Sequence, residues 1–249
     1  SSRTTPPDGL VSFELLLTFK FILPIYWSYK AVLKTQTTTI SHEGIVLPKK
    51  LNQVISMTTP LFKTTAHAKS WLESALSNAV SDIRDAWHSG GLTYFSDGCV
   101  SKTVIWRHFD QASATLSFYT DSRSSKWAAF RTSDDRAAIL LYCPKRLIQL
   151  SIQGQAITES GTKRTKSLYS SLTPKQQLDY QSRAAPGEPQ TTEFWPGPKE
   201  IDTAQSDKFF GLVSVKFDAF DFISLHRSGH QRLSGKHFSD LRTWTWRIP

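Results

Sequence analysis

A segment rich in hydroxyl groups and cations follows an apolar one at residues 118–126, FYTDSRSSK. Phe118, Tyr119 and Thr120 favour a β-strand, whereas the residues after Lys126, WAAF, suit a short helix. The first N–H groups of a helix have no intrahelical partner and carry partial positive charge, so this transition offers a site for an anion. An ordinary polar helix start, with serine as the cap, is the alternative interpretation.

A second candidate lies just before it, in the segment SKTVIWRHFD at residues 101–110. Lys102 and Arg107 bracket apolar and β-branched residues, which is typical of an amphipathic strand whose cations are solvated. The same pattern suits a strand edge that lies along a planar ligand while its cations meet the anionic end of that ligand. The residues alone leave both interpretations open.

Several other site signatures are missing from the sequence. It contains no GxxxxGK[ST] loop, no GxGxxG fingerprint and no GxSxG elbow. His226 and His230 are four residues apart, but in a strand and turn this spacing does not bring two rings together, and no acidic or cysteine partner completes a zinc site. A polar contact to a ligand by His230 and Arg232 fits this segment better.

Composition favours one sizeable core in a chain of 249 residues with 39% hydrophobic content. The net charge of +9 is spread along the chain, and most aromatic residues alternate along expected strands, so a basic surface and core packing are favoured over nucleic-acid binding. Cys99 and Cys143 show no CxxC spacing, which predicts two reduced, buried thiols and a cytoplasmic protein.

The N-terminal region does not match the rest. Residues 10–27 are largely apolar, but Glu14, Lys20 and Pro24 interrupt them, so a membrane span is disfavoured, although a membrane anchor stays an alternative. Met57 is the only methionine in the sequence. We therefore expect residues 1–56 to be untranslated upstream sequence or a poorly ordered extension, and residues 57–249 to form the domain.

The pattern from Met57 onward predicts about six short strands and a few helices. Apolar spacing predicts a helix over 67–87 with Thr64 or Thr65 as its cap, and Asp97-Gly98 predicts a hairpin turn. Thr173-Pro174 predicts a helix start within a helical region at 162–182. The other expected elements are strands at 114–120, 137–143 and 147–157, a short helix at 124–133, a long loop at 183–208, one or two strands at 209–227, a turn at 228–235 and a closing strand at 244–248. Short strands joined by hairpins argue for a small barrel.

Taken in order, these pieces resemble the pyridoxamine 5'-phosphate oxidase superfamily of FMN-binding split barrels, and its less characterised branch with a TDxRSxK motif in particular. The segments that carry the resemblance are KTVIWRHFD, LSFYTDSRSSKWAAF, AAILLYCPKRLIQLSIQGQA, HQR and WRIP. The resemblance runs from about residue 62 to Pro249. It implies an α+β fold, mainly β, in which a six-stranded split β-barrel with flanking helices forms a homodimer with FMN between the subunits.

The resemblance also implies a role for individual residues. The FMN-binding residues would be Lys102, Thr103, Val104, Ile105, Tyr119, Thr120, Arg123, Ser124, Ser125, Lys126, Gln149 and Arg232. Residues 123–126 would hold the phosphate, Gln149 would reach FMN across the dimer interface, and Arg232 would lie near the isoalloxazine. Arg107 and His230 would face the substrate.

Departures from the oxidase pattern weaken the case for vitamin B6 chemistry. Lys102 stands where an arginine is usual, and Ser125 replaces the arginine of the oxidase SRK motif. The substrate-loop pattern YFxSRPxxSQ survives only as DYQSRAAPGEP, one residue short. The sequence therefore predicts an FMN-dependent oxidoreductase with an unassigned small-molecule substrate. A pyridoxamine phosphate oxidase and a non-catalytic binder of flavin or haem are the alternatives.

Overall fold

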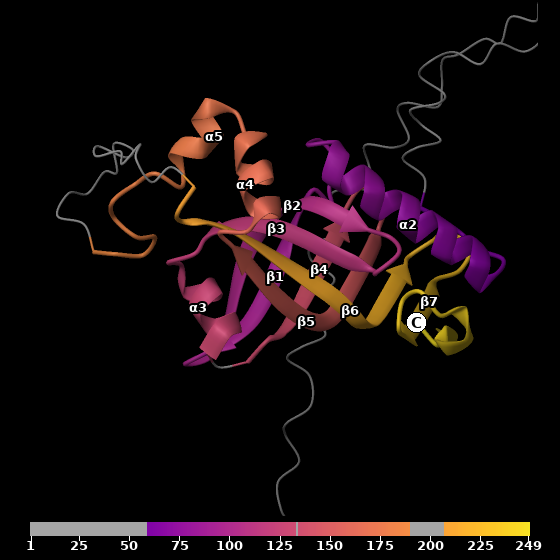
Figure 1. Ribbon diagram of the computed structural model, residues 1–249. Helices are drawn as coiled ribbons and strands as arrows, with labels where there is room; N and C mark the ends of the chain where they lie inside the picture. Colours follow the sequence, from indigo (N-terminus) through magenta and orange to yellow (C-terminus); the bar gives the residue numbers. More distant parts are fainter. Residues whose placement is uncertain (1–58, 133, 190–206) are drawn as a thin grey trace, which may run out of the picture. The chain divides into compact units, whose positions relative to one another are not determined.

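The structure is a computed structural model that describes residues 59–132, 134–189 and 207–249 (Figure 1). Its strands are β1 (Ser89–Ser96), β2 (Gly98–Asp110), β3 (Thr115–Asp121), β4 (Arg136–Cys143), β5 (Ile148–Ser160), β6 (Phe210–Ser224), β7 (Gln231–Lys236) and β8 (Thr245–Arg247). Its helices are α2 (Thr65–Ser81), α3 (Ser125–Thr132), α4 (Lys163–Ser170), α5 (Pro174–Leu178) and a 3-10 turn, η3 (Leu241–Thr243). The expected extension at 1–56 lies outside the described residues.

Six antiparallel strands close into a barrel, as the sequence predicts. The sheet order is β3-β2-β1-β4-β5-β6-β7-β8, and an additional pairing between β3 and β6 closes the first six strands on themselves. β7 and β8 continue the sheet from β6 outside the barrel. β6 is a single strand of 15 residues that pairs with β3, β5 and β7.

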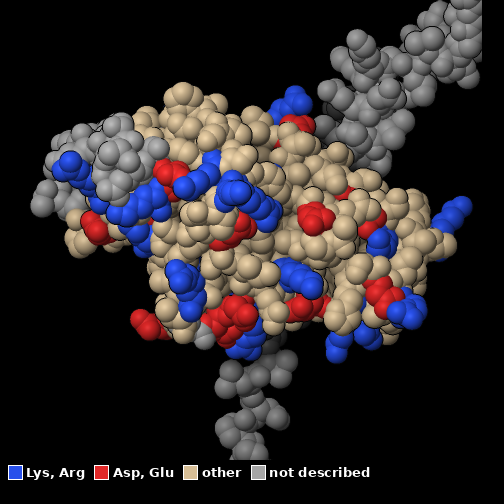
Figure 2. Space-filling model, in the orientation of Figure 1, with Lys and Arg blue, Asp and Glu red and all other residues tan. Residues whose placement is uncertain are grey.

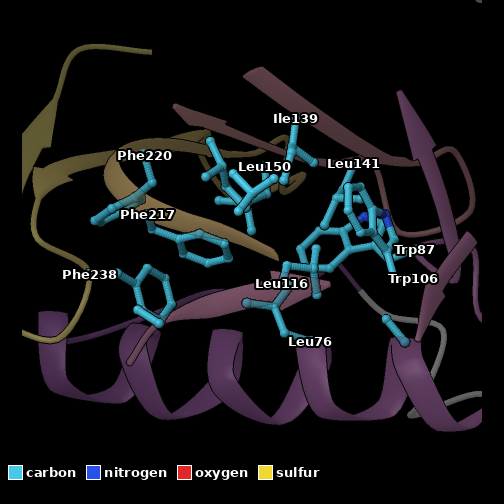
Figure 3. Close-up of a cluster of buried hydrophobic side chains, with 14 of the residues drawn as sticks. Leu76, Trp87, Trp106, Leu116, Ile139, Leu141, Leu150, Phe217, Phe220 and Phe238 are labelled. Atoms are coloured by element: carbon cyan, nitrogen blue, oxygen red, sulfur yellow. The ribbon is translucent and has the colours of Figure 1, made fainter. Parts of the chain in front are cut away.

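Every second side chain along the strands points into the barrel and fills its interior. In β4, buried and exposed residues alternate without a break, so that one face packs on the core and the other meets solvent. Trp106 of β2, Leu141 of β4 and Phe217 of β6 lie in this core, and Leu76 of α2 packs from outside the barrel (Figure 3). The core therefore joins the barrel to α2.

Local capping signals in the sequence set the helix boundaries. Thr64 is the N-cap of α2 and accepts a hydrogen bond from the backbone N–H of His67, as expected. Thr173 is the N-cap of α5 with a proline at the first turn, so residues 162–182 form two helices rather than one. The helix expected to reach residue 87 ends at Ser81. Ile83, which falls within the expected helix, lies beyond that end and is 79% exposed.

Two further expectations are corrected, and one strand has an irregularity that the sequence analysis did not predict. The segment 228–235, predicted as a turn, contributes strand β7, because its residues pair with Ala219–Ser224 of β6. Cys99 is exposed near the tip of the β1–β2 hairpin, whereas Cys143 is buried as predicted. β5 is bulged at Gly154, where an added Cβ would lie 2.0 Å from the carbonyl oxygen of Lys216, so this close approach of two backbones requires glycine.

The described helices do not include one that is long and apolar enough to cross a membrane. Basic and acidic side chains are interspersed on the face shown in Figure 2, with a group of basic side chains at the end that carries α4 and α5. This arrangement agrees with the spread of charge seen in the sequence. α3 lies at the same end of the barrel as α4 and α5, and β7 lies at the other end (Figure 1).

Candidate functional site

Hydroxyl groups and one ammonium group converge where β3 passes into α3. Thr120 Oγ1 lies 3.1 Å from Ser124 Oγ and accepts a hydrogen bond of 3.1 Å from Lys126 Nζ. Ser125 Oγ lies 3.2 Å from the hydroxyl of Tyr94, which comes from β1. We call these five residues the hydroxyl corner. It stands at the N-terminus of α3, where backbone N–H groups lack intrahelical partners.

The hydroxyl corner holds a cation in an unfavourable setting. Burial lowers the pKa of Lys126 and the nearby ammonium of Lys102 lowers it further, while Asp121 acts in the opposite direction. The carboxylate of Asp121 is already engaged, because Arg123 donates to its two oxygens at 3.0 Å and 2.7 Å. An anion placed between Lys102 and Lys126 would relieve this repulsion.

Trp127 fixes the position of α3 against the barrel. Its indole is 5% exposed and covers Gly211 of β6, which is the direct strand partner of Thr120. A Cβ at residue 211 would lie 2.4 Å from Cζ3 of Trp127, well inside normal carbon contact. Glycine at this position therefore lets α3 sit close enough for Lys126 to reach Thr120.

Arg123 is engaged away from the hydroxyl corner. Besides Asp121, its guanidinium donates to the backbone carbonyls of Ser182 and Arg183, each at 2.9 Å, and it lies 3.6 Å above the ring of Phe209. These contacts join the end of β3 to two segments far along the chain. The structure thus brings the side chains of Ser124 and Lys126 to Thr120, but it directs the Arg123 side chain to protein partners.

The alternation of β2 separates the residues predicted to lie along the flavin. Val104 is 7% exposed and packs in the core, so only its backbone could meet a ligand. Thr103 and Ile105 point to the opposite, outer face, where Ile105 is 45% exposed. Lys102 shares the face of Val104 but is exposed at its end of the barrel. The same rule places Tyr119 and Thr120 on opposite faces of β3.

Arg107 belongs to a second cluster, on the outer face of β2 and β3. The ring nitrogen Nε2 of His108 lies 2.6 Å from the hydroxyl of Tyr119, and the Arg107 guanidinium lies 5.9 Å from the centre of the Tyr119 ring. Tyr119 and Tyr180 both pack on Phe210, with ring centres 4.9 Å and 5.0 Å away. We call His108, Arg107, Tyr119 and Tyr180 the arginine–tyrosine cluster.

Burial and charge set the protonation of this cluster. Burial lowers the pKa of His108, and the guanidinium groups of Arg164 and Arg107 add to the effect. Burial raises the pKa of Tyr119 and, more strongly, that of Tyr180. At neutral pH the histidine and both phenols are therefore neutral hydrogen-bonding groups beside cationic arginines, an arrangement suited to an anionic ligand group.

The remaining predicted residues lie at the end of the barrel opposite α3. Gln149, Ile223 and Arg232 are direct partners in neighbouring strands β5, β6 and β7, so they form one row on the outer face. Nε of Arg232 donates to both carboxylate oxygens of Asp221, at 3.1 Å and 3.0 Å. His230 is exposed just before β7. Within one chain, this row and the hydroxyl corner do not meet.

Sequence reasoning missed two members of these groups, Tyr94 and His108. Tyr94 and Ser125 are 31 residues apart in the sequence, and the position of β1 in the barrel brings their hydroxyl groups together. No local sequence motif predicts this contact. His108 stands at a bulge, because the register of β2 against β3 shifts between Trp106 and His108. The only sequence signal for a polar His108 is the segment RHFD, which follows a run of apolar residues.

Comparison with known proteins supports the resemblance. Residues 94–159 match the family model of the pyridoxamine 5'-phosphate oxidase FMN-binding domain. This span begins at Tyr94 and includes the whole hydroxyl corner, Arg107 and Gln149, but not Arg232 or His230. A comparison with curated proteins gave no match.

Two solved structures share the fold. A pyridoxamine 5'-phosphate oxidase-related FMN-binding protein from Nostoc punctiforme PCC 73102 matches with a TM-score of 0.55 and 20% identity, over 72% of this chain and 96% of its own. PhzG from Burkholderia lata 383, in complex with tetrahydrophenazine-1-carboxylic acid, matches with a TM-score of 0.55 and 19% identity, over 78% of this chain and 100% of its own. The chain therefore has the FMN-binding split-barrel fold, and its residues 94–159 correspond to the FMN-binding domain of the pyridoxamine 5'-phosphate oxidase family, whose cofactor is FMN.

Proposed function

We propose that this chain is a flavoprotein that binds FMN at the hydroxyl corner and acts as an FMN-dependent oxidoreductase on a small-molecule substrate. The observation that carries the proposal is the half-buried Lys126. Its ammonium lies near Lys102, its pKa is lowered, and the carboxylate beside it is occupied by Arg123. Such a cation needs an anion, and the terminal phosphate of FMN supplies one.

The chemistry of the hydroxyl corner fits a phosphate group. Lys102 and Lys126 supply positive charge, and Thr120, Ser124 and Ser125 supply hydroxyl groups that can donate to phosphate oxygens. The N-terminus of α3 adds free backbone N–H groups of the kind that bind phosphate. Among the predicted phosphate ligands, Arg123 would act indirectly, by holding the turn that presents Ser124 and Ser125.

A homodimer explains why the predicted flavin residues form separate groups. Gln149 and Arg232 lie in one row at one end of the barrel, and the hydroxyl corner lies at the other. In a dimer, Gln149 and Arg232 of one subunit would approach the flavin held by the phosphate-binding residues of the other. Exposed apolar side chains on the outer face of the barrel, among them Ile105, Leu140 and Tyr142, would be covered in such a contact.

Bound FMN supplies hydride or electron transfer, and the protein supplies binding, orientation and electrostatics. We assign the anionic end of the substrate to the arginine–tyrosine cluster, where Arg107 faces two neutral phenols. His230 of the other subunit would contact the substrate. Two free cysteines, Cys99 and Cys143, agree with a reducing compartment, and we infer a cytoplasmic location.

Pyridoxamine or pyridoxine 5'-phosphate oxidation is the second candidate. The observation that favours it is the approach of Tyr180, from the shortened substrate-loop segment, to the cluster that contains Arg107. Release of hydrogen peroxide on adding pyridoxamine 5'-phosphate to the FMN-loaded protein in air would support it. Bleaching of the flavin by NAD(P)H and reoxidation in air, without that release, would point to another substrate.

The primary test removes the ammonium of Lys126. Lys126→Ala should weaken FMN binding by about 1.5–3 kcal/mol, or roughly ten- to 150-fold, because a charge-assisted contact to phosphate is lost. FMN fluorescence quenching measures the affinity. Lys145→Ala is the matched control, since Lys145 is exposed in the turn after β4, at the other end of that strand from α3. Equal FMN affinity in both variants, or a protein that takes up no FMN at all, would overturn the proposal.

A further inference from the structure

Arg123 lies in a tight turn that also presents part of the hydroxyl corner. The backbone N–H of Ser124 donates to the carbonyl of Asp121 at 3.0 Å, and the backbone N–H of Arg123 donates to Oδ1 of Asp121 at 2.8 Å. The guanidinium of Arg123 adds two hydrogen bonds to the same carboxylate. The position of Ser124, a predicted phosphate ligand, is therefore tied to the position of Arg123.

The same guanidinium holds the segment that follows α5. Its Nη2 and Nη1 atoms donate to the backbone carbonyls of Ser182 and Arg183, each at 2.9 Å. Shortly before these carbonyls in the chain comes Tyr180, a member of the arginine–tyrosine cluster, which packs on Phe210 with ring centres 5.0 Å apart. Arg123 therefore fixes the backbone that carries Tyr180.

A second turn in the chain separates this role from simple stabilisation of a turn. Asp82 and Arg84 form the same local arrangement, in which Arg84 donates from its backbone N–H at 2.9 Å and from its guanidinium at 3.1 Å and 3.3 Å. The Arg84 side chain is 86% exposed, and its guanidinium makes no hydrogen bond to any other described residue. The carbonyl contacts of Arg123 are therefore an addition to the turn and not a requirement of it.

The charges around Asp121 link the turn to the occupancy of the hydroxyl corner. Burial and the ammonium of Lys102 lower the pKa of Lys126, whereas the carboxylate of Asp121 raises it. The Asp121 side chain is 5% exposed, so water screens its charge little, and both Lys126 and Arg123 draw on it. An anion at the hydroxyl corner would give Lys126 a counter-charge of its own and leave Asp121 to Arg123. The turn, and the carbonyls bound beyond it, would then be held more firmly.

We propose that Arg123 is a positioning residue that couples two sites: an anion bound at the hydroxyl corner tightens the hold of Arg123 on the segment that carries Tyr180. The inference rests on the proposed function, which assigns FMN phosphate to the hydroxyl corner and the substrate anion to the arginine–tyrosine cluster. It adds an order of binding, in which FMN completes the substrate site before the substrate enters. By linkage, the substrate anion must raise FMN affinity by the same factor.

Hydrogen exchange of the full chain, followed by mass spectrometry, measures how firmly the segment is held. The amides of Tyr180 and Gln181 are the reporters, because they donate to backbone carbonyls of α5 at 3.0 Å and 3.2 Å and exchange only when the segment opens. Saturating FMN should slow this exchange at least about fivefold. Riboflavin, which lacks the phosphate, should change it by less than about twofold.

Two variants identify the path of the coupling. In Arg123→Gln the segment should exchange at least about tenfold faster at saturating FMN, because its charge-assisted contacts are lost, and FMN should no longer slow the exchange. Arg84→Gln is the matched control and should keep the full effect of FMN. The amides of Leu72 and Leu76 in α2, whose side chains are fully buried, report whether the fold is intact. Equal effects of FMN in the two variants, or an effect of riboflavin as large as that of FMN, overturn the inference.

Asp121→Asn tests the coupling without removing the turn. The asparagine oxygen can still accept a hydrogen bond from the backbone N–H of Arg123, but the charge that Lys126 and Arg123 share is gone. The slowing by FMN should therefore fall below about twofold in this variant. This variant decides the matter if Arg123→Gln does not fold, and a full effect of FMN in Asp121→Asn overturns the inference.

Failure of FMN binding can be distinguished from failure of the coupling. If the chain takes up no FMN, the exchange experiment is made with inorganic phosphate, against chloride at the same ionic strength. Slower exchange in phosphate that is lost in both Arg123→Gln and Lys126→Ala would support the coupling and refute only the flavin assignment. Exchange that phosphate does not slow would refute the coupling as well.

Discussion

Replacement of Gly211 by alanine tests whether Trp127 positions the hydroxyl corner. The added Cβ would lie 2.4, 2.9 and 3.0 Å from three ring atoms of Trp127, whereas carbon atoms normally approach to about 3.5 Å. The indole must therefore move by about 1 Å. Because it is 5% exposed, it cannot swing into solvent and must take α3 with it.

The cost follows from overpacking and from lost contacts. Extra methyl groups in a packed core typically cost about 1–3 kcal/mol of unfolding free energy. A shift of about 1 Å would also take the 3.1 Å contact between Lys126 Nζ and Thr120 Oγ1 beyond hydrogen-bond range. We therefore expect Gly211→Ala to lower the free energy of unfolding by about 1–3 kcal/mol. Its FMN affinity should also fall by roughly tenfold.

Urea unfolding of the flavin-free protein and FMN fluorescence titration measure the two effects. Gly91→Ala in β1 is the control, because its Cβ would meet only Leu140 atoms at 3.8 Å and 3.9 Å, an ordinary contact. In a double-mutant cycle with Trp127→Phe, the cost of Gly211→Ala should shrink, since the smaller ring leaves room for the methyl group. Behaviour of Gly211→Ala indistinguishable from that of Gly91→Ala would refute the reasoning.

Two further predictions concern acid stability and the role of Arg123. The pKa of His108 is lowered in the folded chain, so as pH falls through about 6.5 the unfolded chain takes up its proton first and the folded state loses stability. Urea unfolding at pH 7 and pH 5 should show a larger loss in the unmodified chain than in His108→Gln, with equal losses contradicting the assignment. Arg123→Lys cannot satisfy Asp121 and two carbonyls at once, and should lower the unfolding free energy by about 1–3 kcal/mol while reducing FMN affinity less than Lys126→Ala does. A drop in FMN affinity as large as that of Lys126→Ala, at unchanged stability, would make Arg123 a phosphate ligand after all.

Local sequence signals were sufficient to predict most of the helix starts and turns of the fold. Thr64 and Thr173-Pro174 act as caps through contacts within three residues, and Asp97-Gly98 forms a turn from its own backbone preferences. Four of the five residues of the hydroxyl corner are neighbours along the chain and stand in one sequence motif, whereas Tyr94 reaches the corner only through the barrel. Where the physical cause lies within a few residues, the sequence is sufficient.

The features that could not be predicted from the sequence depend on contacts between residues far apart in the chain. Arg123 looked like one cation among several, yet its partners Ser182 and Arg183 lie 59 and 60 residues away. Segment 228–235 was expected to be a turn because glycine and polar residues dominate it, but pairing with β6 makes part of it a strand. The opposition of Arg232 and Arg247 exists only through the register of β7 against β8. No local preference encodes these contacts.

The central position of β6 has a consequence for synthesis of the protein. Until residues 210–224 leave the ribosome, strands β1 to β5 can form only an open sheet, with the edges of β3 and β5 unpaired. Open edges of this kind invite pairing with other nascent chains. Gly211 and its neighbours pair with both open edges and also contact Trp127. We therefore expect FMN to bind only after the barrel has closed. Chaperone protection should matter most while residues 161–209 are being translated, before β6 is available.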